Sequence, residues 1–340
     1  MITKVFTQQN MARLAVVAGA AVVVLGAGAI KSDASIKQTA NGDGSITVSW
    51  DEETATDFSI GIAGEIEGKS DTFDRAKAAA ASRQIVLPAD AREYTFTGID
   101  NYNSYYVCLN YSSAAGSTYY TYVSNCYGKL PTVRNLSQDT WYKYILQCSV
   151  TWDRLPGNCE YEVMFMDSKG KKIESKKSSS TSYTRYKIDN NRVYTVKVRA
   201  TRKQAYGSAL PEESSGWSAT EYLFCQPTIQ SYSINKKGEL TIKWNKIKGV
   251  TSYKIYVADK LKKKSLKKLG AVKANKNSIT LKGYGKKNKT KFDPKKTYYA
   301  YVLPYKKVKG KTIEKGAVYY YTLKGKGGSK PSESYVSAFK

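Results

Sequence analysis

Lysine offers the most chemistry in this chain, and it is concentrated toward one end. From Cys225 to the last residue there are 30 lysines, no arginine and five acids, a net charge of +25 against +27 for the whole chain. Such a field attracts polyanions and speeds their encounter with the protein. Because ammonium groups act as point charges, whereas bidentate reading of bases favours arginine, we expect a charged polymer rather than nucleic acid. The partner we predict is an anionic cell-wall or extracellular polysaccharide, with a protein partner as the alternative.

The densest lysine stretches are expected in three connections between strands of the last unit, where side chains reach solvent. The alternative is an ordinary solvated surface in a lysine-rich composition, without a ligand. The predicted polyanion-binding residues are Lys260, Lys262, Lys263, Lys264, Lys267, Lys268, Lys286, Lys287, Lys289, Lys306, Lys307, Lys309 and Lys311.

Catalytic chemistry has little support in the residue types. Histidine is absent from all 340 residues, which excludes Ser-His-Asp and Cys-His catalysis and histidine-ligated metals. An S-x-x-K pattern begins at Ser233 and again at Ser265, but the S-D-N and K-T-G motifs that accompany it in enzymes are missing. A pair of carboxylates that hydrolyses glycosides is left open by the sequence, although units of this size leave little room for a deep cleft. We predict a protein that is not an enzyme and that holds no cofactor and no metal.

The five cysteines are candidates for disulfide bonds in an exported protein. Cys108 and Cys126 lie on strands expected to be neighbours, so a bridge between them is predicted. Cys148 is expected to point inward and to form a disulfide bond with Cys225, which leaves Cys159 without a disulfide partner. The alternative is that all are small buried hydrophobic residues. No Cys-x-x-Cys pair exists, so a zinc or redox site has little support.

The chain has 29 tyrosines, several of them in consecutive groups such as Tyr319 to Tyr321. Because adjacent residues of a strand point to opposite faces, part of each group is predicted to lie outside the core. Exposed aromatic rings stack on sugars, which makes a carbohydrate-binding module one alternative function. The simpler interpretation is cross-strand packing on an outer sheet face.

The elements that position these side chains follow a pattern that occurs three times. Trp50, Trp152 and Trp244 each end an alternating apolar run, and period two with one apolar face predicts a half-buried strand. Further on, an apolar residue, an Asp and four more residues precede a Tyr that begins another alternating strand. Recurrence at intervals of roughly a hundred residues predicts copies of one small domain, with the tryptophans and tyrosines in its core. The tyrosines are Tyr105, Tyr194 and Tyr298.

This skeleton resembles the fibronectin type III family, which has a Trp on its second strand and a Tyr six residues after an apolar residue. Residues 215–218 (Ser-Gly-Trp-Ser) are similar to the last strand of that family, and 295–299 with 305–311 resemble its bacterial members. The resemblance covers about 36–340. It implies two-sheet sandwiches in which the Tyr hydroxyl bonds back to the backbone and locks a corner. The first unit departs from the pattern at 71–84, where a short helix or loop is expected.

The first residues have the features of an export signal. Lys4 and Arg13 precede an uncharged apolar run of seventeen residues from Leu14 to Ile30, and Ala27-Gly28-Ala29 fits a cleavage site. Because that length is at the short limit for a spanning helix, an uncleaved membrane anchor is the alternative. This segment is the only membrane contact that we expect.

The sequence therefore predicts an all-β chain of three tandem fibronectin type III-like sandwiches after a signal or anchor helix. We expect a secreted or cell-surface binding or adhesion protein whose basic third domain contacts anionic polymers. The alternatives are a structural spacer without a ligand of its own and a carbohydrate-binding module. The predicted parts are a 1–29 leader and domains at 36–130, 131–226 and 227–340.

Overall fold

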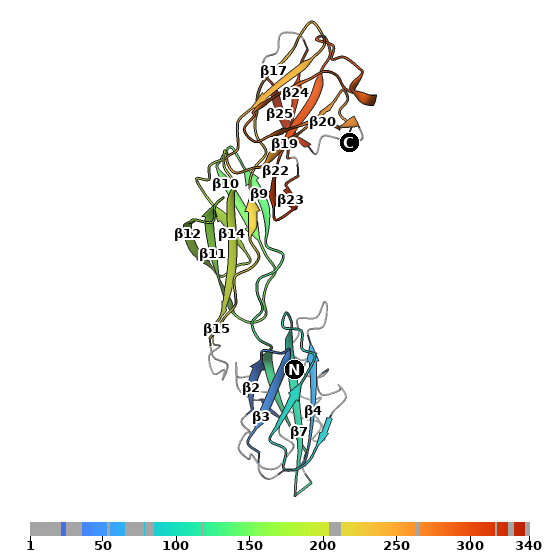
Figure 1. Cartoon of the computed structure of the whole chain (residues 1–340). Coiled ribbons are helices and arrows are strands. Elements are labelled where there is room, and N and C mark those ends of the chain that lie inside the picture. Colours follow the sequence, from blue (N-terminus) through green and yellow to red (C-terminus); the bar gives the residue numbers. More distant parts are fainter. Residues whose placement is uncertain are drawn as a thin grey trace, which may run out of the picture.

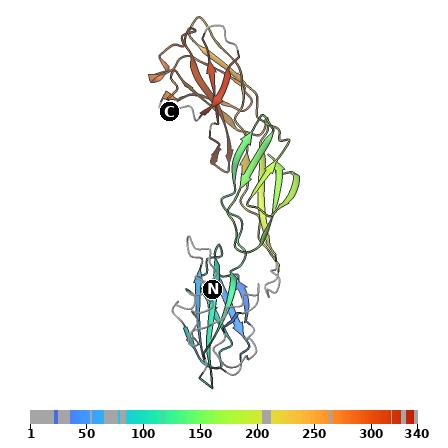
Figure 2. The ribbon, with the colours of Figure 1, turned by 180° about the vertical axis from the view of Figure 1, so that it is seen from behind.

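The chain forms antiparallel β-sandwiches that follow one another along an elongated molecule, as both views of the ribbon show (Figures 1 and 2). We describe it from a computed structural model. The described residues are 22–24, 36–52, 55–64, 78, 85–116, 118–203, 212–262, 265–316, 318–325 and 330–336. Nearly all regular structure in them is strand, so the predicted all-β fold class is confirmed.

The first sandwich packs a three-stranded sheet, in the order β2-β3-β6, against a five-stranded sheet in the order β1-β8-β7-β4-β5. The strands are β1 (Val22–Val24), β2 (Ile36–Asn41), β3 (Ser45–Trp50), β4 (Ala55–Gly64), β5 (Ile85–Leu87), β6 (Glu93–Phe96), β7 (Ser104–Ser113) and β8 (Thr118–Tyr127).

Strand β1 lies inside the segment that the sequence predicts to be helical. Its three residues pair antiparallel with Tyr120 to Tyr122 at the edge of β8. The helix prediction is therefore wrong for Val22–Val24, where three consecutive β-branched side chains favour a strand. The rest of 1–35 lies outside the described residues, as does 71–84 apart from Ala78, which is helical. In the described part, no helix is long and apolar enough to cross a bilayer.

The second sandwich pairs a β13-β10-β9 sheet with a β12-β11-β14-β15 sheet, to which β16 adds by pairing with β14. The predicted boundaries at 130/131 and 226/227 fall in the connections before β9 and after β16. The strands are β9 (Ser137–Tyr142), β10 (Gln147–Thr151), β11 (Cys159–Asp167), β12 (Lys172–Ser178), β13 (Ser182–Arg185), β14 (Tyr194–Arg202), β15 (Glu213–Ser214) and β16 (Glu221–Leu223).

The third sandwich repeats this plan with a β17-β18-β21 sheet and a β20-β19-β22-β24-β25 sheet, with β23 paired to β22. Its elements are β17 (Ile229–Ile234), β18 (Leu240–Trp244), β19 (Ser252–Ala258), β20 (Lys267–Lys273), β21 (Ser278–Leu281), the 3-10 turn η2 (Lys286–Asn288), β22 (Tyr298–Val308), β23 (Lys311–Glu314), β24 (Tyr319–Leu323) and β25 (Ser332–Tyr335).

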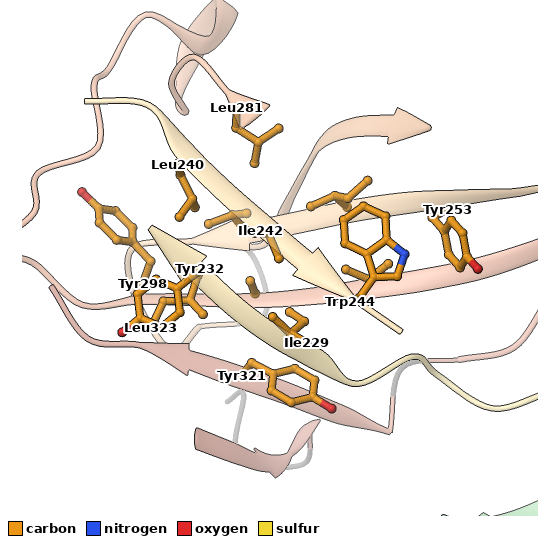
Figure 3. Close-up of a cluster of buried hydrophobic side chains, with 14 of the residues drawn as sticks. Ile229, Tyr232, Leu240, Ile242, Trp244, Tyr253, Leu281, Tyr298, Tyr321 and Leu323 are labelled. Carbon is orange, nitrogen blue, oxygen red and sulfur yellow. The ribbon is translucent and has the colours of Figure 1, made fainter. Parts of the chain in front are cut away.

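A buried tryptophan organises the core of each sandwich. Along β18 the buried positions alternate with less buried ones, as the period-two pattern predicts, and Trp244 ends the strand fully buried. Trp50 and Trp152 occupy the same place in their sandwiches and are 4% and 5% exposed. Each indole lies 5.4 Å, centroid to centroid, from the aromatic ring that opens the next strand. Figure 3 shows this pair, Trp244 and Tyr253, in the core of the third sandwich.

The tyrosine corner that the resemblance implies is present in all three sandwiches. The Tyr hydroxyl accepts a hydrogen bond from the backbone N–H of the Asp five residues earlier, at 2.9 Å for Tyr105, 3.0 Å for Tyr194 and 2.8 Å for Tyr298. Tyr194 and Tyr298 are buried, whereas Tyr105 is half-buried against its core. Each bond fixes the chain where it enters the longest strand of its sandwich.

Candidate polyanion-binding surface

The third sandwich has two ends, and strand direction decides which connections meet at each. Strands β17, β19, β21 and β24 run away from the second sandwich, and β18, β20, β22 and β25 return toward it. We call the end away from the second sandwich the far end, and the end that contacts it the near end. The far end comprises the described parts of 235–239, 259–266, 282–297 and 324–331.

Hydrogen bonds tie the 235–239 turn to the 282–297 connection, and β17 to the start of the 324–331 connection. The Phe292 N–H donates to the Gly238 carbonyl at 3.0 Å, and the Tyr232 hydroxyl donates to the Lys324 carbonyl at 2.6 Å. Gly238 adopts a φ of +68°, and a Cβ there would lie 2.8 Å from the Lys291 side chain. Glycine is therefore required where the first turn meets the long connection before β22.

Fourteen exposed lysines lie at this end, twelve on four connections that are distant in sequence and two, Lys267 and Lys268, at the start of β20. The acids are few: Glu239 accepts a hydrogen bond from the Asn235 side chain at 2.8 Å, and Asp293 caps the backbone N–H of Lys295 at 2.8 Å, while Asp259 is exposed. Like charges gathered at one end raise the local potential and attract a polyanion. The lysines are Lys236, Lys237, Lys260, Lys262, Lys267, Lys268, Lys282, Lys287, Lys289, Lys291, Lys295, Lys296, Lys324 and Lys330.

The predicted lysines are divided by the structure into two groups. Lys260, Lys262, Lys267, Lys268, Lys287 and Lys289 are exposed at the far end. Lys306, Lys307, Lys309 and Lys311 lie instead on the β22–β23 hairpin at the near end. Through β19, Lys268 is level with Tyr301 of β22, and Lys306 lies five residues further along that strand, so the two groups are about 16 Å or more apart and lie toward opposite ends of the sandwich.

Three predicted lysines cannot be placed in this way. Lys263 and Lys264 lie outside the described residues, and of Lys286 only the backbone, in η2, is described. Conversely, sequence analysis missed Lys236 and Lys237, which occupy the first turn. Counting strand directions would have found them, because the first and fifth connections of such a sandwich open at the same end.

Two lysines at the near end, Lys306 and Lys315, have structural partners. The ammonium of Lys306 donates to the Gly249 carbonyl at 2.8 Å and lies 5.5 Å from the ring centroid of Tyr222 in the second sandwich. Burial lowers the pKa of Lys306 from its usual 10.5. Lys315 forms an ion pair with Glu221 of the second sandwich. These two lysines therefore contribute to the junction between sandwiches, whereas Lys307, Lys309 and Lys311 of the same hairpin are exposed.

The consecutive tyrosines are mostly packed inside. Tyr319, Tyr320 and Tyr321 are 5%, 6% and 2% exposed, so replacing Tyr319 would disturb the fold rather than report on sugar binding. The tyrosines that are most exposed in the described chain stand elsewhere, close to the near end: Tyr142, Tyr144, Tyr186 and Tyr335.

The described structure contains no disulfide bond, so neither predicted pairing is formed. In the β7–β8 register Cys126 faces Tyr105 and Cys108 faces Tyr122, which places the two cysteines at different rungs of the ladder. Cys148 and Cys225 share the core of the second sandwich with Cys159. Burial raises the pKa of Cys148 and of Cys225 to about 12 and also raises that of Cys159. These thiols are protonated at neutral pH and are poor nucleophiles.

The S-x-x-K residues form no catalytic arrangement in the part of the chain that is described. Lys268 is exposed on β20 opposite Tyr256, and the Ser265 N–H is used to close a turn on the Lys262 carbonyl. Among the described residues, no group of three His, Cys, Asp or Glu side chains is arranged to hold a metal ion.

Comparisons with known proteins find similar solved structures but no relative in sequence. No protein-family model matches the chain, and no curated protein matches it. Of solved structures, the FN1–FN3 domains of chicken CNTN1 are 13% identical to the chain, with 85% of this chain and 96% of that one covered and a TM-score of 0.33. A two-domain fibronectin type III segment of chicken tenascin is 12% identical, with 56% and 99% covered and a TM-score of 0.29.

Proposed function

We propose that this chain is a non-catalytic binding protein of the cell exterior, and that the far end of its third sandwich holds anionic polymers. The observation that carries the proposal is the gathering of fourteen exposed lysines, from four separate connections and the start of β20, on one end. In the described chain, the ion pairs that third-sandwich lysines form with acids are those of Lys254 with Glu314 and Lys315 with Glu221. Both lie away from the far end, whose ammonium groups are left available to a ligand.

The chemistry of the surface favours an acidic polysaccharide or cell-wall glycopolymer. Lysine side chains are flexible, strongly hydrated point charges that follow a polymer of variable sequence without fixed geometry. Exposed aromatic side chains are absent from the described residues of the four far-end connections, whose aromatic residues are the half-buried Tyr284 and the buried Phe292. Binding by charge alone, rather than by stacking on bases or sugar rings, is what such a surface supports.

An extracellular location is part of the proposal. It rests on the export signal of the first 29 residues, together with sandwiches whose cores are closed around Trp and Tyr side chains. Cleaved export delivers the chain to where anionic polysaccharides are found, and an uncleaved leader would hold it at the membrane surface.

A matched pair of variants tests the proposed surface. In the first, Lys260, Lys267, Lys268 and Lys289 at the far end are replaced by Gln. In the control, the exposed lysines of the second sandwich Lys169, Lys171, Lys172 and Lys176 are replaced by Gln, which changes the net charge equally.

The measurement is binding of the full chain to immobilised heparin, and in parallel to a polyuronate, at moderate salt. We expect the far-end variant to bind about tenfold or more weakly, because fewer polymer counterions are released on binding when four ammonium groups are removed. The control should bind nearly as well as the original chain. Equal losses in both variants would show attraction to net charge without a site, and no loss in either would refute the proposed function.

A second candidate, a spacer without its own ligand, is favoured by a different observation. The near end of the third sandwich is fastened to the second by buried contacts, which is what a spacer requires. If the chain binds neither polymer at low salt, the spacer is the remaining function.

A further inference from the structure

The second and third sandwiches share hydrophobic packing across their boundary. Phe224 and Val193 of the second sandwich are fully buried within the same cluster as Trp244 and Val250 of the third. Phe224 comes from the segment that connects the two sandwiches, and Val193 comes from the connection before β14. Unfolding either partner exposes part of the apolar surface of the other.

A single glutamine adds main-chain hydrogen bonds at the same boundary. The side-chain oxygen of Gln226 accepts from the N–H groups of Val318 and Tyr319, at 3.1 and 3.0 Å. Its side-chain nitrogen donates to the Tyr319 carbonyl at 2.7 Å. The side-chain amide of Gln226 thus bonds to the backbone at the start of β24 much as a neighbouring peptide group would. Gln226 is buried, at 7% exposure.

Backbone pairing also joins the two sandwiches at a second place in the junction. The Lys248 N–H donates to the Asn191 carbonyl at 2.6 Å, and the Val193 N–H donates to the Lys248 carbonyl at 2.8 Å. These bonds form a short parallel bridge between the connection before β14 and the connection after β18. Two separate attachments, at Gln226 and at Lys248, prevent rotation about either one.

Lys143 lies at the centre of the junction and is the most buried lysine of the described chain, at 7% exposure. It comes from the turn between β9 and β10, and its ammonium forms an ion pair with Glu333 of β25. The ammonium also donates to the Tyr321 hydroxyl at 2.9 Å and lies 4.4 Å from the ring centroid of Tyr319. The Tyr144 hydroxyl donates to the same Glu333 carboxylate.

We propose that the second and third sandwiches unfold and refold as one cooperative unit, and that the Lys143–Glu333 ion pair holds the two together. Removing the carboxylate leaves a charged ammonium buried among aromatic rings, which destabilises both sandwiches because each supplies one half of the junction. A consequence is that the far end is held in a fixed direction relative to the second sandwich. This inference does not depend on the polymer-binding function.

Hydrogen exchange of backbone amides in the full chain, read by mass spectrometry, tests the proposal. The amides of β11 and β14 report on the second sandwich, and those of β19 and β22 report on the third. In the original chain we expect both pairs to exchange through the same opening equilibrium, to within about threefold.

The test variant is Glu333→Gln, and we expect it to speed exchange in both sandwiches by about tenfold or more. The matched control is Glu239→Gln, the same chemical change at the far end, which should speed exchange only in its own turn. If Glu333→Gln unfolds the chain, Tyr144→Phe is the alternative variant. It removes just one hydrogen bond to Glu333 and should give a smaller acceleration of exchange, again in both sandwiches. Acceleration confined to the third sandwich, or absent from both, would overturn the proposal.

Discussion

The two ends of the third sandwich use the same residue type in opposite ways. At the far end, lysines such as Lys260 and Lys289 are exposed and form no ion pair with an acid of the described chain. At the near end, Lys306 is half-buried on Tyr222, Lys315 pairs with Glu221, and the second sandwich contributes its own buried Lys143. Exposed ammonium groups are available to a ligand, while desolvated ones are committed to structure.

The contrast shows that net charge alone does not locate a binding surface. A basic domain places lysines at both ends, and only burial and pairing decide which of them a polymer can reach. We therefore expect substitution of the buried or paired lysines Lys143, Lys306 and Lys315 to change stability with little effect on binding, and far-end substitutions to do the reverse. The predictions below test that division, beginning with the largest effect.

Removing the tryptophan of the third sandwich should affect the second one too. Trp244 is fully buried in the cluster that contains Phe224, so Trp244→Ala should cost about 3–5 kcal/mol and weaken both sandwiches. Trp50→Ala should cost a similar amount but confine its effect to the first sandwich. Chemical denaturation followed by hydrogen exchange in each sandwich measures both. An intact second sandwich after Trp244→Ala would contradict the shared core.

Two side-chain amides offer a matched comparison between the ends. Gln226→Ala removes three buried hydrogen bonds at the near end and should cost about 1–3 kcal/mol. Asn235→Ala removes the bonds that its side-chain oxygen accepts from the N–H groups of Lys237 and Glu239 at the exposed far end, and should cost about 1 kcal/mol or less. The free energy of unfolding in urea gives both values. Equal costs would mean that the near end is not specially stabilised.

The smallest effect concerns the pH dependence of Lys306. Because burial lowers its pKa in the folded chain, the unfolded chain binds more protons in the window below the usual pKa of 10.5. This residue therefore makes the folded state more stable as pH rises through that window. Lys306→Met should remove that contribution, so the variant gains less stability than the original chain between about pH 8 and about pH 10.

Exposed Lys260 serves as the control, since Lys260→Met should leave the pH dependence as it is. Thermal unfolding of the three proteins across this pH range makes the comparison. The tyrosines with raised pKa values are present in all three proteins and therefore affect the pH dependence of stability equally. Parallel curves for the Lys306 variant and the original chain would show that Lys306 is not desolvated.

The parts of the fold that depend on local spacing were predictable from sequence. The tryptophan strands and the Asp-to-Tyr corner bonds involve residues two to six positions apart, so Trp152 and Tyr194 could be assigned from pattern alone. The junction could not, because Lys143 and Tyr321 are 178 positions apart and no periodicity connects them. The burial of Lys143 also runs against its residue type, which normally predicts exposure.

The candidate site was predictable in part for the same reason. Clustering in sequence identified Lys267 and Lys268, which the structure keeps together at the far end. It also grouped them with Lys309 and Lys311, although a long strand, β22, carries these to the other end. The position of a charge cluster on the surface can therefore be predicted from the sequence only when the directions of the strands are also considered.

The dependence of heparin binding on salt tests the central claim most directly. The affinity of the full chain should be measured from about 0.05 M to about 0.5 M salt, alongside the far-end variant and its second-sandwich control. The account predicts a plot of log affinity against log salt with a slope of about −3 or steeper, which becomes shallower by roughly 3 in the far-end variant alone. A flat plot for the original chain, or the same slope in all three proteins, would contradict it.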